Sequence, residues 1–204
     1  MEDKIKYYSI ILIAICTVIF IMQSFLSGFT DAFVLDSQML NERPWTLITS
    51  VFLHGSLSHL AFNMFALFLF GLLLEKFIGS KKFLAVFFVS GLAASVAASF
   101  FYSSSLGASG AIYGVIGALA AIKPKMTVWT YGVPMPMVAA ALFYLLLDFA
   151  GLFYPTNVAN AAHIGGLLCG VIIGLALRKP EPRQEKREKI LTDVEFREWE
   201  DHWM

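Results

Sequence analysis

The chain has 204 residues, of which 58% are hydrophobic and only 15% are charged, and its mean hydropathy is +0.70. Soluble globular domains are about 45–50% apolar and about 25% charged, so this composition excludes an ordinary soluble protein and indicates a membrane protein. The formal net charge is zero, which gives no indication of a nucleic-acid partner. Cys16 and Cys169 fall in apolar stretches, where cysteines are typical of small buried hydrophobes rather than of a disulfide framework.

Six apolar stretches are candidates for membrane-spanning helices, each of which needs about 20 residues. We expect them at residues 5–27, 57–77, 82–102, 107–122, 134–153 and 157–177. The first lacks a small-residue cleavage signature, so we interpret it as a retained helix rather than a signal peptide. The sequence therefore predicts an all-α membrane protein with six transmembrane helices.

The basic residues indicate how these spans are oriented. Of the 15 Lys and Arg residues, Arg43 alone falls on the face opposite to the others. Because cytoplasmic loops carry the excess of Lys and Arg, we predict a multi-pass protein of the cell membrane with both termini in the cytoplasm. A count of five or seven spans would scatter the same charges over both faces.

Two long segments lie outside the predicted spans. Residues 28–56 mix charged side chains with Phe, Leu, Met and Trp, a pattern typical of a folded first external loop embedded in the membrane interface. Residues 179–204 alternate charges, and we predict a cytoplasmic charged tail that is a short helix or disordered and has no catalytic role. Residues 1–178 would then form the membrane core.

Polar side chains on three spans fall at one depth. With a rise of about 1.5 Å per residue from the basic residue that ends each span, Ser109 lies at roughly 21 Å, His163 at roughly 22 Å and Asn63 at roughly 20 Å, and His59 lies at roughly 25 Å. In a hydrocarbon core about 30 Å thick, this layer is close to the outer surface. Because ionisable residues in a membrane are costly, the layer indicates a functional site.

The fourth span is short, at roughly 24 Å of helix, so its outer end would stop inside the membrane. Non-helical backbone at that depth is tolerated only where it is buried in protein or lines a watery cavity. Ser109 would then stand at the start of a helix, beside free backbone N–H groups and the positive end of the helix dipole. Hydrolysis requires such access to water.

Ser109 and His163 are the candidate nucleophile and base, because histidine usually takes the proton that makes a serine hydroxyl nucleophilic. Asn63 and His59 are side-chain donors for an oxyanion. No carboxylate is expected to orient the histidine. Glu75 lies at the cytoplasmic end of its span, and Asp148 lies on a helix that cannot be placed against His163. We therefore predict a Ser–His dyad rather than a triad.

Small residues recur every four positions on spans four and six, a spacing that lets membrane helices pack backbone to backbone. They are Gly110, Gly114 and Ala118 on span four, and Gly166, Gly170 and Gly174 on span six. This packing would bring Ser109 and His163 within hydrogen-bond reach. Tyr113 lies one turn below Ser109 and is predicted to pack on the imidazole.

Over residues 1–178 the chain resembles the rhomboid intramembrane serine proteases. The resemblance rests on three motifs, which are similar to the family's GxSG, AHxxGxxxG and HxxxN patterns. In this chain they read Gly107-Ala108-Ser109-Gly110, Ala162-His163 followed by Gly166 and Gly170, and His59-Leu60-Ala61-Phe62-Asn63. The chain departs from many rhomboids in the first external loop, where Arg43-Pro44-Trp45 stands in place of a Trp-Arg pair.

The resemblance implies a serine endopeptidase that cleaves transmembrane protein substrates near the outer face of the lipid membrane. It implies oxyanion roles for His59 and Asn63, a supporting role for Tyr113 and a structural role for His54. It implies neither a cofactor nor a metal. It also implies that span five, with Phe149 and Phe153, moves sideways to admit the substrate.

Three other interpretations stay open. A zinc site formed by His54, His59 and His163 would lack cysteine, carboxylate and metal-specific spacing. A membrane chaperone or trafficking factor would bind spans without cutting them, although this chain keeps both Ser109 and His163. A small transporter would use the polar layer as its binding site, although the layer has no carboxylate and the sequence shows no half-repeat symmetry.

Overall fold

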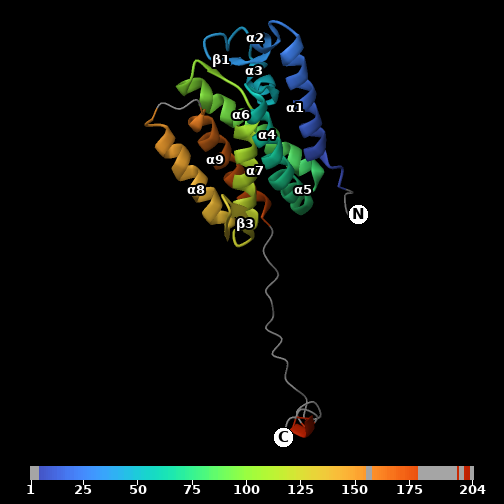
Figure 1. Cartoon of the computed structure of the whole chain (residues 1–204). Helices are drawn as coiled ribbons and strands as arrows, with labels where there is room; N and C mark the ends of the chain where they lie inside the picture. The colour runs from blue at the N-terminus through green and yellow to red at the C-terminus, as the bar shows by residue number, and fades with distance from the viewer. Residues whose placement is uncertain (1–4, 155–157, 179–196, 198–199, 203–204) are drawn as a thin grey trace.

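The computed structural model describes residues 5–154, 158–178, 197 and 200–202. Within these residues, four helices are long and apolar enough to cross a membrane: α1 (Tyr8–Phe25), the rod Leu57–Ile78, α6 (Ser80–Phe101) and α9 (Asn160–Leu177). Two shorter apolar helices, α7 (Ser109–Ile122) and α8 (Met137–Gly151), pack with them (Figure 1). These six helical segments overlap the predicted spans. The predicted tail, residues 179–204, lies largely outside the described residues.

The rod Leu57–Ile78 consists of α4 (Leu57–Ala66), the π-helical segment η2 (Leu67–Gly71) and α5 (Leu72–Ile78). The Ser56 hydroxyl caps its first turn by accepting a hydrogen bond from the His59 N–H at 3.1 Å. Near its other end, the fully buried Glu75 carboxylate accepts hydrogen bonds from the N–H groups of Tyr8 and Ser9. The start of α1 is thereby fixed against the rod.

A β-hairpin stands where the sequence predicted the beginning of span five. β3 (Thr127–Thr130) pairs antiparallel with β4 (Val133–Pro136), and Tyr131 and Gly132 connect them with φ of 50° and 78°. Positive φ at both residues of a two-residue loop matches the twist of a hairpin. Because the two prolines of β4 lack an N–H, they suit a strand outside a larger sheet. Helix α8 therefore begins at Met137 and is shorter than predicted.

The loop between α1 and α4, which was predicted to be external, is built from short elements: α2 (Phe29–Phe33), β1 (Leu35–Asp36), α3 (Thr46–Thr49) and the 3₁₀ turn η1 (Ser50–Phe52). β1 pairs antiparallel with β2 (Ser104–Ser105), which precedes α7. The loop and the β3–β4 hairpin lie at opposite ends of the helices (Figure 1). The fold is mostly helical, as predicted, and the described residues also form two small two-stranded sheets that were not predicted. The β1–β2 ladder ties the loop to the segment that leads into Ser109.

Helices α7 and α9 pack backbone against backbone. α7 lies in the middle of the helices, between α6, α8 and α9, and most of its residues are buried (Figure 1). A Cβ added at Gly166 or Gly170 would overlap the carbonyl oxygen of Gly110 or Gly114, respectively. Small residues every four positions permit this approach. The contact sets the first turns of the two helices side by side.

Candidate active site

Ser109 is the first residue of α7 and is half-buried. The chain reaches it through Gly107, whose φ of 123° and whose N–H bond to the Ser50 carbonyl at 2.9 Å fix the turn. A Cβ at Gly107 would lie 2.8 Å from the His59 ring, so the turn requires glycine. The first backbone N–H groups of a helix have no partner within the helix, and Ser109 begins this first turn of α7.

His163 lies in the first turn of α9 with 8% of its surface exposed. Its Nε2 atom is 2.8 Å from Ser109 Oγ. When Nδ1 carries the ring proton, the serine hydroxyl donates to Nε2, which is the arrangement that a general base requires. The two side chains are 54 residues apart in the chain and meet because α7 and α9 begin side by side.

Asp148 of α8 also contacts the histidine, which corrects the expectation that no carboxylate reaches the ring. Its Oδ1 atom is 2.8 Å from His163 Nδ1, and the residue is 4% exposed. The sequence places Asp148 on an apolar helix but does not give the rotation of that helix about its axis. α8 packs against α9, and this packing places the carboxylate against the imidazole.

Tyr113 covers one face of the imidazole. The two rings are stacked with centroids 4.1 Å apart and planes inclined by 16°. A second aromatic neighbour of Tyr113 is Tyr144 of α8, at 5.8 Å between ring centroids. The stack restricts tilting of the histidine ring out of its plane.

Asn63 and His59 lie on α4 and line the same groove as Ser109 and His163. One N–H of the Asn63 amide donates to the carbonyl of His59 at 2.8 Å. This bond holds the amide in place and leaves its second N–H for another acceptor. The His59 Nδ1 atom accepts the Gly55 N–H at 3.4 Å, so its Nε2 atom faces the loop before Ser109.

His54 lies behind His59, edge to face, with ring centroids 5.1 Å apart. Burial, followed by the charge of His59, lowers the pKa of His54 from 6.5 to about 4, so this ring is neutral at pH 7. The Gln23 side chain of α1 makes two hydrogen bonds to the His54 backbone. Its Oε1 atom accepts the His54 N–H at 3.0 Å, and its Nε2 atom donates to the His54 carbonyl at 3.3 Å. Gln23 was not among the residues predicted for the site. The sequence signal for it was a polar amide side chain in a mainly apolar span.

A groove of about 1160 Å³ joins this site to the β3–β4 hairpin. Ser109, His163, Asn63 and His59 lie along it, with Phe and Leu side chains of the rod Leu57–Ile78. Trp129 and Tyr131 of the hairpin line it as well. The groove is long and mainly apolar, with its few polar groups concentrated at the serine.

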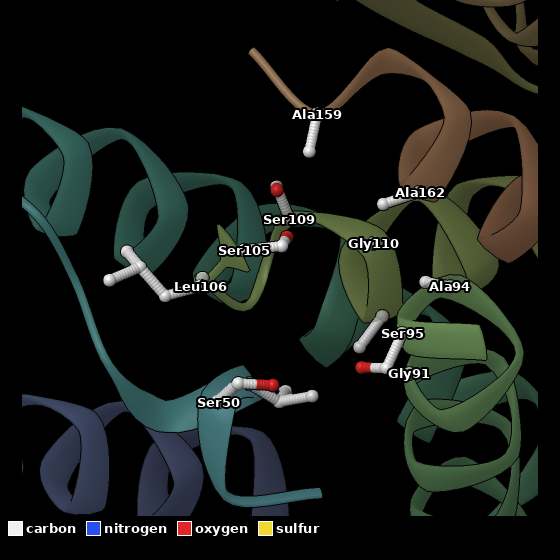
Figure 2. Close-up of a pocket in the computed structure, with 13 residues that line it drawn as sticks. Ser50, Gly91, Ala94, Ser95, Ser105, Leu106, Ser109, Gly110, Ala159 and Ala162 are labelled. Carbon is white, nitrogen blue, oxygen red and sulfur yellow. The ribbon is translucent and has the colours of Figure 1, made fainter. Parts of the chain in front are cut away.

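A second, much smaller cavity of about 20 Å³ also has Ser109 in its lining (Figure 2). Side chains of Ser50, Ser95 and Ser105 line it together with small residues of α6 and α9. A space of this size, with several hydroxyl groups around it, is sufficient for one water molecule. Figure 2 shows Ser105 beside Ser109 and Ser95 near the glycine-rich start of α7.

Within the described ranges, no three His, Cys, Asp or Glu side chains are grouped so that they could hold a metal ion. The histidines considered for zinc therefore do not form such a group. Ser109, His163 and Asp148 form a hydrogen-bonded group among helices that are long and apolar enough to cross a membrane, which defines the chain as an integral membrane protein with a polar site between its helices.

The comparisons with known proteins agree with this class. Residues 41–180 match the family model described as "Rhomboid domain". The Rhomboid protease GluP of Bacillus subtilis is 37% identical over 142 residues, 67% of this chain and 27% of GluP. RHOMBOID-like protein 6, mitochondrial, of Arabidopsis thaliana is 37% identical over 140 residues, 67% of this chain and 44% of that protein. The Rhomboid protease GlpG of Haemophilus influenzae is 28% identical over 172 residues, 81% of this chain and 88% of GlpG.

The chain belongs to the rhomboid family and is a multi-pass membrane protein. It spans less than half the length of GluP and of RHOMBOID-like protein 6.

Proposed function

We propose that this chain is a serine endopeptidase that hydrolyses peptide bonds of transmembrane proteins near the outer face of the membrane. The observation that carries the proposal is the 2.8 Å between Ser109 Oγ and His163 Nε2 inside an apolar groove. GluP and GlpG, to which the chain is similar, are rhomboid proteases by name.

The reaction begins when Ser109 Oγ attacks the carbonyl carbon of the substrate peptide bond. The hydroxyl proton passes to His163 Nε2, and the carbonyl oxygen becomes an oxyanion. His163 then gives that proton to the leaving amine, which departs and leaves an ester on Ser109. Water, deprotonated by the same nitrogen, hydrolyses the ester and restores the serine. The cycle uses no cofactor.

The oxyanion has three donors within reach of the groove. The Ser109 N–H stands at the start of α7, where the helix dipole also favours negative charge. The free N–H of the Asn63 amide and the His59 ring are the other two. We assign Gly107, Gly110 and Gly166 a supporting role, because each permits a close approach that a side chain would block.

We further propose that all six apolar helices cross the membrane and that both termini lie in the cytoplasm. The short α7 then has its outer end, with Ser109, below the membrane surface. The loop with α2 and α3 embeds in the outer interface, and residues 179–204 form a separate cytoplasmic tail. This orientation rests on the one-sided distribution of Lys and Arg.

The substrate reaches the serine through the groove between the rod and α8. Phe149 and Phe153, at the outer end of α8, are exposed and pack on each other at 5.4 Å. Sideways movement of this end of α8 would open the groove to a substrate helix.

The test combines a covalent probe with a cleavage assay. We expect the purified wild-type protein to react with a fluorophosphonate and to cut a transmembrane reporter, because both reactions need a nucleophilic serine. Ser109→Ala should do neither, whereas Ser103→Ala, which changes an exposed serine near β2, should do both. Mass spectrometry of the labelled protein would locate the probe.

Labelling and cleavage, together with an uptake measurement, distinguish the protease from the rival functions. A wild-type protein that binds reporters but neither cuts nor labels would be a chaperone or trafficking factor. Cleavage that persists in Ser109→Ala would remove the named nucleophile. Reporter-independent uptake of a small solute into proteoliposomes, without labelling, would favour a transporter.

Asn63→Ala should lower kcat by about 10²–10³-fold and leave KM within a few-fold, because one oxyanion donor is lost. Asn63→Asp keeps the shape but replaces the amide donor by an acceptor, so its kcat should fall at least as far. Rates are measured per folded molecule, and Asn41→Ala in the exposed loop is the control. An unchanged kcat in Asn63→Ala would remove this residue from the oxyanion site.

A further inference from the structure

We infer that Asp148 is a positioning residue that orients His163, so that the site operates as a serine–histidine–aspartate triad. The inference rests on the proposed function, since it concerns the base of that reaction. It departs from the dyad that the sequence predicts, and it assigns a chemical role to the carboxylate on α8.

The first support is geometric. Asp148 Oδ1 and Ser109 Oγ lie at opposite nitrogens of one imidazole, each at 2.8 Å. The two contacts use the two different ring nitrogens, so a single orientation of the imidazole satisfies both of them. Three separate helices supply the three side chains.

The second support is chemical. A carboxylate only accepts hydrogen bonds, so Nδ1 must carry the ring proton and donate to Asp148. Nε2 is then left with a lone pair, which accepts the serine proton. The opposite tautomer would place a proton on Nε2 and a lone pair against the carboxylate, and it could not act as a base toward Ser109.

The third support is the position of the carboxylate in an apolar environment. Asp148 is 4% exposed on a helix whose neighbouring residues are almost all hydrophobic. Burying a carboxylate is costly unless it is paired, and a leucine at this position would pack at no such cost. The neutral imidazole pairs with it through the Nδ1–H hydrogen bond, and the carboxylate in turn stabilises the positive ring that forms during the reaction.

Stacking and hydrogen bonding constrain the ring in different ways. Tyr113 fixes the plane of the imidazole, but a stacked ring that flips by half a turn about its Cβ–Cγ bond returns to the same plane. The bond to Asp148 distinguishes the two nitrogens and removes this freedom. Tyr113 therefore sets the plane, and Asp148 sets which nitrogen faces the serine.

The experiment compares Asp148→Ala and Asp148→Asn with wild type by two measurements. The first is kcat and KM on the transmembrane reporter, per folded molecule. The second is the ¹⁵N spectrum of the His163 ring in protein labelled at histidine, which identifies the protonated nitrogen. His163→Ala identifies the signals, since the chain has four histidines. Leu147→Ala, at the exposed neighbouring position of α8, is the matched control.

In wild type we expect the proton on Nδ1. Asp148→Ala should populate both tautomers and lower kcat by about 10²–10⁴-fold with KM within a few-fold. In Asp148→Asn the amide N–H can donate to Nδ1 and place the ring proton on Nε2, so this variant should favour the opposite tautomer and show a kcat at least as low as that of Asp148→Ala. Leu147→Ala should match wild type in both measurements.

Two results would overturn the inference: a kcat in Asp148→Ala within about twofold of wild type, or an unchanged tautomer in that variant. A purely structural role would lower the yield of folded protein without changing either quantity per folded molecule. If wild type itself neither cuts nor labels, the proposed function fails. The spectrum would still report whether Asp148 holds the ring.

Discussion

We expect the double variant Ser109→Ala, His163→Ala to hydrolyse a transmembrane reporter no more slowly than either single variant. Each single change should lower kcat by at least about 10⁴-fold, because a nucleophile without its base and a base without its nucleophile fail at the same step. Their Oγ and Nε2 atoms are 2.8 Å apart, so the two side chains act as one unit. The measurement is the single-turnover rate constant of cleavage for the wild type, the two single variants and the double variant.

The comparison also has a control within the site. Asn63→Ala combined with His163→Ala removes an oxyanion donor as well as the base, and these side chains act on different atoms of the substrate. A further loss in that pair, but not in the serine–histidine pair, would support the assigned roles. If the Ser109 and His163 losses multiply instead, the two residues do not share a proton-transfer step.

The second large effect is expected in the seam between α7 and α9, where Gly166 and Gly170 pack against the backbone of α7. Gly170→Leu should destabilise the fold by at least about 3 kcal/mol, because even its Cβ would overlap the Gly114 carbonyl oxygen and neither backbone can move aside. Activity should be lost with the fold. The measurement is the denaturant midpoint in mixed micelles.

Ala176→Leu provides the matched control, since it adds three carbons to an exposed position of the same helix. It should unfold at the wild-type denaturant concentration and retain activity. A stable and active Gly170→Leu protein would show that α9 can separate from α7 without harm.

The sequence predicted that Ser109, His163 and Asn63 lie at one height because a helix rises by a constant amount per residue. Counting from charged residues at one membrane face then gives height without any knowledge of packing. The method gives height only. It says nothing about the direction in which a side chain points, which is why Asp148 was missed.

A signal for Asp148 was nevertheless present. α8 ends at Gly151, three residues after Asp148, and α9 begins at Asn160, three residues before His163. In two antiparallel helices joined by a loop, residues equally distant from the loop lie at similar heights. The predicted bounds, 153 and 157, give distances of five and six residues, so the similar height could be counted from the sequence and only the rotation of α8 about its axis could not.

The β3–β4 hairpin was missed for a related reason. Val133, Pro134, Met135 and Pro136 are apolar, so a hydropathy count adds them to the following helix. The turn residue Gly132 and the two prolines were the local signals against helix. Composition describes whether a segment prefers lipid, and it does not describe backbone geometry.

The seam between α7 and α9 also bears on how the lipid bilayer acts on the site. A thinner or thicker bilayer changes the tilt of membrane helices. Two helices in backbone contact tilt as one body, so the spacing of Ser109 and His163 is insulated from bilayer thickness. α8 joins that body through side chains and through the hairpin, and it brings Asp148. We therefore expect lipid composition to act on the carboxylate contact and on the width of the groove, while Ser109 and His163 keep their distance.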